Sequence, residues 1–443
     1  MKRVLLVSGL TEKVLRVASS ASTITSRSAW RVAPALLLSL AMVAATPVAA
    51  APPVPAANAA VITTWNQIAV STVTAGGASP TNFNYFAFVH LAMYNAVVGI
   101  TGEYELYRWN RPAPHRASPE AAAAAAAHRV LTTYFPAATA TLDAQLAASL
   151  ALVPDGGPQD SGISYGRRAA DHIIALRAND GRNAAVTVPV GTGAGHWRPE
   201  PATALFASAW LGGVTPLAIE SATQFAPGPP PPINSATYFG EFNEVRDYGE
   251  LNSLVRTPAQ TQTARFFSDA GIGPMQGALR LFATENALDI DDSARMFAAV
   301  DTSIADGAIT VWYGKLQYMW WRPITAIRNA DIDGRDDTAK IDNWTPLIGT
   351  PPYPDWPSGL CSVVGAVSTV LTRLNGDGTL DLNVTSAAAG ETRHFATKAV
   401  MAQQAIDARV WSGIHFRTAD EVSITIGTNV ANYVLDHYFQ PID

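Results

Sequence analysis

Residues 294–323 read ARMFAAVDTSIADGAITVWYGKLQYMWWRP, and this stretch gives the strongest indication of the architecture. Apolar residues recur along 294–321 at the spacing of a helix, and Pro323 marks the end of that helix or a bend in it. From Val311 onward the stretch has almost no polar residues apart from two cations, so this part does not form a solvated face. We therefore predict a long and largely buried helix.

The same helical spacing recurs along the chain, whereas the alternation typical of strands is scarce. Residues 118–150 predict one long helix or a tight pair, and Ser118-Pro119-Glu120 is a helix-start signal. Residues 183–238 have no sustained period, and a loop this long lines a site or packs as an ordered cap. The fold is predicted to be all-α. The remaining predicted helices lie at 61–69, 86–98, 165–178, 257–268, 360–374, 387–408 and 420–439.

The composition is that of a compact globular protein. Of the 443 residues, 48% are hydrophobic and 15% are charged, which argues against a disordered or nucleic-acid-binding chain. The length exceeds one small core and predicts one large or two fused helical units. Cys361 is the only cysteine, so no intramolecular disulfide can form and the fold depends on packing.

The first fifty residues have the layout of a secretory signal. Arg27 and Arg31 precede the apolar run 35–45, which ends in the small residues of Pro47-Val48-Ala49-Ala50. The run is too short to span a bilayer, and an uncleaved N-terminal anchor is the alternative. The predicted division of the chain is a signal peptide, a linker and one helical domain, at 1–50, 51–59 and 60–443.

Removal of the signal peptide would leave 24 basic and 35 acidic residues, a formal net charge of −11. Such a surface repels nucleic acid and anionic lipid, so we expect no nucleic-acid partner and no stable membrane insertion after cleavage. We expect the mature protein to be secreted or periplasmic. The sequence leaves the oligomeric state open, because apolar helical faces serve cores and subunit interfaces alike.

Two cations, Lys315 and Arg322, stand among the aromatic and aliphatic residues of the opening stretch. A separation of seven positions is close to two helical turns, which predicts that both side chains leave one helix face roughly 10 Å apart along the axis. A buried cation is unstable unless a carboxylate or an anionic ligand accompanies it. This segment alone leaves a structural ion pair and an oxyanion site both open.

A second segment is the proline-rich loop 351–360, PPYPDWPSGL, which leads into the apolar run 363–371. Ser358 and Gly359 therefore stand where a helix begins. Free backbone N–H groups and the helix dipole favour an anion at such a place. An ordinary helix N-cap by Ser358 is the alternative.

Arg409 and His415 form the third candidate pair. On one straight helix an offset of six positions would point their side chains about 120° apart. Convergence on one ligand therefore needs a break between them, and Ser412-Gly413 supplies a candidate break. Taken alone, His415 also fits a buried structural histidine.

Together and in this order, the three segments resemble the signature shared by vanadium-dependent haloperoxidases and type 2 phosphatidic acid phosphatases. The pattern is Lys-six residues-Arg-Pro, then Pro-Ser-Gly, then Arg-five residues-His. The segments VHLAMYNA at 89–96 and GTGAGHWRP at 191–199 resemble the secreted bacterial haloperoxidase-like branch, and the resemblance covers about 60–443. It implies an all-α fold of two four-helix bundles with long ordered loops and a site in the core of one bundle.

The resemblance also implies roles for the site residues. Five residues would neutralise or hydrogen-bond the equatorial oxygens of vanadate: Lys315, Arg322, Arg409, Ser358 and Gly359. Phosphate would be a competing or alternative ligand of the same residues. His415 would be the axial group, ligating vanadium in a haloperoxidase or attacking phosphorus in a phosphatase. With His415, the cations Lys315 and Arg322 are the predicted catalytic residues.

Two positions depart from the family pattern. Leu360 stands where the family has the acid–base histidine of Pro-Ser-Gly-His, and leucine cannot move a proton. Ala419 stands where the phosphatase branch has an aspartate that orients the axial histidine, and Asp420 follows one position later.

Three functions remain open after these departures. The first, favoured by the whole-chain resemblance, is a vanadate-dependent haloperoxidase that oxidises halide or a related substrate with hydrogen peroxide and uses water or another side chain as its proton shuttle. The second is an acid phosphatase or phosphoesterase with His415 as nucleophile. The third is a catalytically impaired oxyanion-binding protein. Halide preference depends on which aromatic residues approach the site, with Tyr353, Trp356 and Trp411 as candidates.

Overall fold

The computed structural model describes residues 57–269 and 271–442. The predicted signal peptide 1–50 lies outside the described residues, and the predicted division of the chain stays a prediction. The helices in chain order are α1 (Ala60–Val73), α2 (Asn82–Thr101), α3 (Pro119–Tyr134), η1 (Pro136–Ala138), α4 (Thr139–Leu150), α5 (Gly157–Leu176), η2 (Ala209–Gly213), α6 (Ala236–Gly249), α7 (Pro258–Asp269), α8 (Ile272–Glu285), α9 (Ile290–Tyr318), α10 (Pro323–Arg328), η3 (Ala330–Ile332), α11 (Gly359–Asn375), α12 (Lys398–Trp411) and α13 (Arg417–His437).

The predicted all-α class is confirmed, and strands within the described ranges are limited to one short hairpin. Residues 118–150 form the tight pair, because η1 separates α3 from α4. The spacing did not predict α6, α8 and α10. The starts of α8 and α10 contain Gly or Pro, which obscures a helical pattern.

The predicted helix at 387–408 is wrong in its first half. Strand β1 (Leu382–Ser386) pairs in antiparallel register with β2 (Glu391–Phe395), and helix α12 starts only at Lys398. Gly390 has φ +66° in the connecting turn, and its N–H donates to the Ser386 carbonyl at 2.9 Å. Side chains in β1 alternate between buried and accessible positions, which is the period of two that a half-buried strand requires.

The first group of helices consists of α1, α2, α3 and α5, and it corresponds to one of the two predicted bundles. Residues 121–127 of α3 are all buried alanines, so neighbouring helices approach this helix closely. At Gly166 of α5 an added Cβ would lie 2.0 Å from the carbonyl oxygen of Ala122. The small residues therefore fix the distance between α3 and α5.

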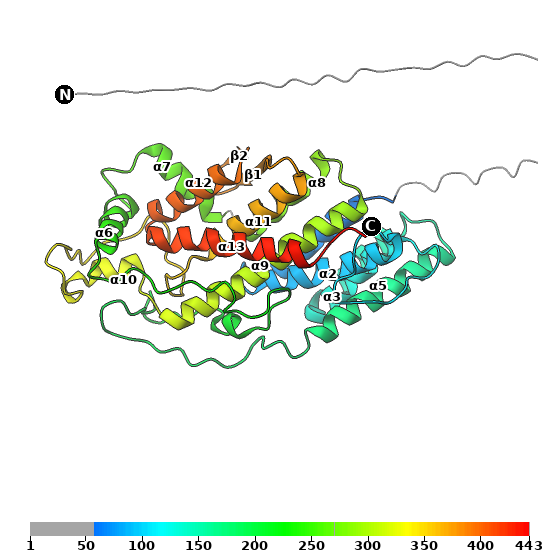
Figure 1. Cartoon of the computed structure of the whole chain (residues 1–443), viewed down its shortest axis with the longest axis horizontal. Coiled ribbons are helices and arrows are strands. Elements are labelled where there is room, and N and C mark those ends of the chain that lie inside the picture. The colour runs from blue at the N-terminus through cyan, green and yellow to red at the C-terminus, as the bar shows by residue number, and fades with distance from the viewer. Residues whose placement is uncertain (1–56, 270, 443) are drawn as a thin grey trace, which may run out of the picture. The chain divides into compact units, whose positions relative to one another are not determined.

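The second group consists of α9, α11, α12 and α13, and it corresponds to the other predicted bundle. Figure 1 shows the long α9 continuing from this group to the side of α2, and α9 packs against helices of both groups. Helices α11 and α13 are in close contact, since an added Cβ at Gly427 would lie 2.0 Å from the carbonyl oxygen of Ser362. Long α9 therefore connects the two bundles into one core.

The long irregular segment 183–238 packs as an ordered cap on α9, as one of its two predicted roles requires. The backbone N–H of Trp197 donates to the Met319 carbonyl at 2.6 Å. Buried Asp306 of α9 accepts three backbone N–H groups at 2.6, 2.7 and 2.9 Å, those of Leu217, Ala218 and Ile219. These bonds hold the segment against the half of α9 that carries the site.

Helix α2 is the one described helix that is long and apolar enough to cross a membrane by length and composition. Its most apolar window is 78% buried inside the protein, and its core positions contact α3, α5 and α9. These properties are those of a central core helix.

Candidate functional site

Lys315 and Arg322 do not leave one helix face, so that part of the prediction is wrong. Helix α9 ends at Tyr318, and Met319 caps it in the left-handed conformation at φ +46°. Arg322 follows in extended backbone, at φ −81° and ψ 157°, as the N-cap of α10. The two side chains nevertheless converge, because both donate hydrogen bonds to the proline-rich loop 351–358.

The Lys315 ammonium is fully buried and donates hydrogen bonds to backbone carbonyls. Its Nζ lies 2.6 Å from the carbonyl oxygen of Pro354, 3.2 Å from that of Asp355 and 2.5 Å from that of Pro357. The ring of Tyr353 lies 5.0 Å from the same nitrogen, at a cation–π distance. Burial, with Arg322 nearby, holds the Lys315 pKa well below its usual value.

Arg322 is buried and only partly satisfied. Its Nε donates to the Tyr353 carbonyl at 2.7 Å, and its Nη1 donates to the Ile414 carbonyl at 2.6 Å. The same Nη1 lies 3.0 Å from Nε2 and 3.3 Å from Nδ1 of His415. Its Nη2 is buried with no hydrogen-bond partner among the described residues. A free guanidinium nitrogen in the interior is available to an anionic ligand.

Ser358 and Gly359 lie at the start of a helix, as predicted. Ser358 is the N-cap of α11, but its side chain does not accept the usual capping hydrogen bond. Its fully buried Oγ has no hydrogen-bond partner in the described structure. The Ser358 hydroxyl and the first N–H groups of α11 are therefore available to the same anion.

The predicted break between Arg409 and His415 is confirmed. Helix α12 ends at Trp411, and Gly413 has φ +79°. The break brings the Arg409 charge close enough to lower the His415 pKa. Arg409 is 7% exposed; its Nη1 makes one long contact of 3.5 Å with the Phe267 carbonyl, and its Nε has no partner among the described residues.

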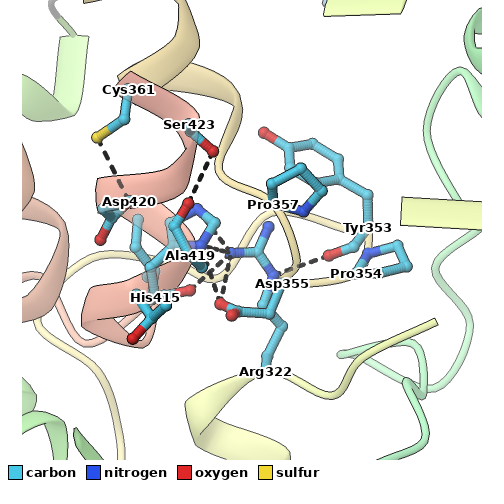
Figure 2. Close-up of polar contacts among 12 residues, drawn as sticks. Arg322, Tyr353, Pro354, Asp355, Pro357, Cys361, His415, Ala419, Asp420 and Ser423 are labelled. Carbon is cyan, nitrogen blue, oxygen red and sulfur yellow. Dashed lines mark hydrogen bonds and ion pairs between the residues drawn. The ribbon is translucent and has the colours of Figure 1, made fainter. Parts of the chain in front are cut away.

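His415 is buried, and Figure 2 shows Arg322 and Asp355 beside it. Burial, and then the charges of Arg322, Arg409 and Lys315, hold its pKa well below the usual value. The ring is therefore neutral at pH 7 and one of its nitrogens carries a lone pair. A neutral imidazole with a free lone pair is the form that ligates a metal centre or attacks phosphorus.

Asp355 is a site residue that the sequence analysis missed. Its Oδ1 lies 2.9 Å from His415 Nδ1 and 3.8 Å from Arg322 Nη1, and the side chain is fully buried. Burial raises the Asp355 pKa well above its usual value, and the cations Arg322 and Lys315 offset only part of this. The one available signal was an acidic residue inside an apolar, proline-rich loop.

Asp420 does not contact His415 through any described hydrogen bond or ion pair, although its place in the sequence suggested an orienting role. It accepts a contact from Cys361 Sγ at 3.4 Å (Figure 2). Burial raises the Asp420 pKa to about 7, and the adjacent Ser358 hydroxyl and Arg409 partly counter this. Asp420 is therefore a second buried carboxyl behind the start of α11.

Leu360 faces an apolar cavity of about 180 Å³ beside the start of α11. Trp312 and Tyr353, whose rings lie 5.1 Å apart, line the same cavity. The two rings also flank the Lys315 ammonium, at 5.6 and 5.0 Å, so the cavity borders the buried cations. Ser79 and Tyr353 contribute the hydroxyl groups of its lining, and the lining contains no histidine, carboxylate, lysine or arginine.

The structure thus gathers five of the six predicted residues, together with Asp355, around the proline-rich loop. Arg409 lies at the edge of this group and is linked to it by charge rather than by a hydrogen bond. The protein therefore belongs to the class of helical-bundle proteins that have a buried cationic site at the start of an inner helix.

Comparisons with known proteins agree with this class. Residues 295–443 match the family model of the VCPO second helical-bundle domain. The chain is 34% identical over 91 residues to the vanadium chloroperoxidase of Curvularia inaequalis, and this match covers 18% of the chain and 14% of that protein.

The fold is that of solved bacterial vanadium haloperoxidases. The crystal structure of the first bacterial vanadium-dependent iodoperoxidase matches 87% of the chain and 96% of its own length, with a TM-score of 0.71 and 24% identity. The holo-type bacterial vanadium-dependent chloroperoxidase matches 81% of the chain and 93% of its own length, with a TM-score of 0.65 and 18% identity. The predicted resemblance to vanadium-dependent haloperoxidases is confirmed, and the link to the phosphatidic acid phosphatases stays a prediction.

Proposed function

We propose that this protein binds vanadate at the buried cations and acts as a vanadate-dependent haloperoxidase-like enzyme on hydrogen peroxide and a halide or related substrate. One observation carries the proposal. Several buried side-chain donors have no hydrogen-bond partner among the described residues, and they include one from each of three predicted oxyanion-binding residues: Arg322 Nη2, Arg409 Nε and Ser358 Oγ. Interior donors of this kind are expected to be paired, so an anionic ligand is the simplest partner for them.

The donor groups present fit an oxyanion with the charge of vanadate or phosphate. Arg322, Arg409 and Ser358 would donate hydrogen bonds, and the N–H of Gly359 would add the positive end of the α11 dipole. Lys315 would contribute charge without a direct hydrogen bond to the anion, because it already donates hydrogen bonds to three carbonyls. His415 would hold the vanadium through a ring nitrogen.

Bound vanadate would supply the activation of peroxide for halide oxidation. The chain itself supplies neutralisation, orientation and exclusion of water. Its buried cations stabilise negative charge in a low-dielectric interior, where such interactions are strongest. The neutral His415 presents a lone pair, and the aromatic wall of Trp312 and Tyr353 limits access of water to the cations.

The proposed enzyme lacks the family's acid–base histidine for proton transfer, and this absence supports one alternative function. Leu360 gives the apolar cavity no acid–base group where the family has histidine. A catalytically impaired oxyanion-binding protein is therefore the second candidate. A phosphatase with His415 as nucleophile has the same geometric requirements and is separated from the first proposal by assay.

We also propose that the mature chain is exported to the periplasm or the medium. The basic and apolar pattern of residues 1–50 supports this. Mass spectrometry of the mature N-terminus from a secreting host tests it: a start at Ala51 is the expected result.

Titration of the mature protein with orthovanadate tests the functional proposal. Bromide and iodide oxidation by peroxide, and hydrolysis of p-nitrophenyl phosphate, are then measured on the same sample. Binding with peroxide-dependent halide oxidation is the expected result. Binding without either activity would favour the impaired binding protein, hydrolysis alone would favour the phosphatase, and absence of binding would reject all three.

A further inference from the structure

The contact recorded between Asp355 and the His415 ring is with Nδ1. Asp355 Oδ1 lies 2.9 Å from Nδ1, and both side chains are at most 1% exposed. The two residues belong to different segments, the proline-rich loop before α11 and the turn between α12 and α13. Contacts of this kind between a carboxylate and an imidazole fix the ring orientation and the tautomer.

Arg322 alone does not select a tautomer. Its Nη1 lies 3.0 Å from Nε2 and 3.3 Å from Nδ1, so it is within reach of both ring nitrogens. Arginine has donors and no acceptor, so the nitrogen that it faces must carry the lone pair. Both Asp355 carboxylate oxygens are buried without a hydrogen-bond partner among the described residues, and Oδ1 lies 2.9 Å from Nδ1. A hydrogen on Nδ1 would face this acceptor, and a lone pair on Nε2 would face Arg322, which lies nearer to Nε2 than to Nδ1.

We propose that Asp355 is the positioning residue of His415, which holds the ring as the Nδ1–H tautomer and directs the Nε2 lone pair toward Arg322. This inference rests on the proposed function, because the lone pair matters only if an oxyanion binds beside Arg322. It gives the chain a substitute for the aspartate that the phosphatase pattern places after the axial histidine, where Ala419 stands here.

Asp420 does not fill this role. Its carboxyl contacts Cys361, and the groups that lower its pKa are Ser358, Arg409, Cys361 and Arg417, with no contribution from His415. Asp355 has a further property that suits a positioning residue. Its own backbone is fixed on both sides, since its carbonyl accepts from Lys315 and its N–H donates to the Trp320 carbonyl at 3.0 Å.

The test is the tautomer of His415 in the protein without added ligand. Long-range proton–nitrogen correlation spectra of the nitrogen-15-labelled protein report which ring nitrogen carries the hydrogen. Comparison with a His415→Gln variant identifies the His415 signals among the eight histidines. We expect Nδ1–H as the single form in the wild type. An Nε2–H ring in the wild type overturns the proposal without any variant of Asp355.

Two variants of Asp355 separate positioning from simple packing. Asp355→Asn keeps an acceptor oxygen in the same shape and is expected to preserve the Nδ1–H form. Asp355→Leu keeps the branching at Cγ but has methyl groups in place of the oxygens and therefore no acceptor, and it is expected to give a mixture of both tautomers. A folded Asp355→Leu protein that keeps the pure Nδ1–H form would overturn the proposal, because packing alone would then suffice.

Calorimetric titration with phosphate and with vanadate on the same samples keeps the two proposals apart. If the wild type binds neither ion yet shows the Asp355-dependent tautomer, the proposed function fails and the positioning role is supported. If vanadate binds to the wild type and the tautomer is independent of Asp355, the positioning role is overturned and the proposed function stands.

Discussion

Lys315 Nζ lies 2.5 Å from the carbonyl oxygen of Pro357, although Lys315 belongs to α9 and Pro357 to the loop that precedes α11. The carbonyls of Pro354 and Asp355 accept from the same ammonium. One buried cation therefore fixes the loop that ends at Ser358. Lys315 therefore positions the loop, and its positive charge would in addition attract an anionic ligand.

We predict that Lys315→Met lowers the free energy of unfolding by about 3–5 kcal/mol, because it keeps the side-chain volume but leaves three buried carbonyls without donors. Urea denaturation measures the change. Lys340→Met is the matched control, since Lys340 is partly exposed and pairs with surface carboxylates. Equal midpoints for Lys315→Met and the wild type would contradict the anchoring role.

We predict that Arg322→Ala and His415→Ala each weaken vanadate binding. For Arg322→Ala, loss of one charge-assisted hydrogen bond of about 1.5–3 kcal/mol corresponds to roughly 10- to 100-fold in affinity. Calorimetry on folded protein measures the effect. Arg129→Ala is a suitable control, because Arg129 pairs with Asp171 at an exposed position. Unchanged affinity in both site variants would refute the proposed site.

Leu360→His should raise turnover, since it places an acid–base group beside the start of α11. A general acid–base contributes about 10²–10⁴-fold, and the gain should approach the lower end if water already shuttles the proton. Steady-state halide oxidation measures it. Leu360→Phe fills the same cavity without a titratable group and should give no gain. A folded Leu360→His protein with vanadate bound and no increase in rate would show that the missing histidine does not limit the reaction.

Asp420 should make stability depend on pH. Its pKa is about 7 in the folded protein, against about 3.9 in an unfolded chain. The folded state therefore binds the proton more tightly, and the free energy of unfolding falls as pH rises from about 4 to about 7. Three pKa units correspond to a loss of about 4 kcal/mol, which is fully developed above pH 7.

Asp420→Asn should remove this loss, so the variant should gain stability relative to the wild type between pH 5 and pH 8. Urea unfolding of both proteins at the two pH values measures the difference. Asp436→Asn serves as the control, because Asp436 is exposed and pairs with Arg373. If the Asp420→Asn protein and the wild type show parallel pH dependence, then Asp420 does not titrate in this range.

The sequence predicted the helices better than the contacts between them. Apolar spacing located α9 and α11 because each has an enclosed face, whereas the hairpin at 382–395 was read in part as helix because its alanines also fit a helix. Asp355 was missed for a different reason. A single aspartate in a proline-rich loop has no periodicity, and its role arises only when the turn after α12 brings His415 next to it.

The convergence of Lys315 and Arg322 was predicted, but its cause was not. A seven-residue interval suggested one straight helix, whereas the chain leaves α9 at Met319 and returns through an extended segment that pairs with Gly195 and Trp197. Its pairing partner, the segment 195–197, is far away in the sequence. Local spacing therefore contained no information about the path, only about the residue types.

A comparison of Gly413 with Gly378 separates two destabilising effects of adding a Cβ: strain from a positive φ and steric overlap with neighbouring atoms. The φ of Gly413 is +79°, and an added Cβ would lie 2.4 Å from the Gly249 carbonyl oxygen and 2.8 Å from Pro346 Cβ. Gly378 has nearly the same φ, +82°, but open space around it. Gly378→Ala should cost about 1 kcal/mol from the backbone alone, and Gly413→Ala about 2–5 kcal/mol because overpacking adds to it. Gly413→Ala should also weaken vanadate binding, since the turn brings Arg409 and His415 together, whereas Gly378→Ala should leave binding unchanged. Equal loss of stability in the two variants would mean that Gly249 and Pro346 shift to make room for the added Cβ. Equal vanadate affinity would mean that the turn does not position Arg409 and His415.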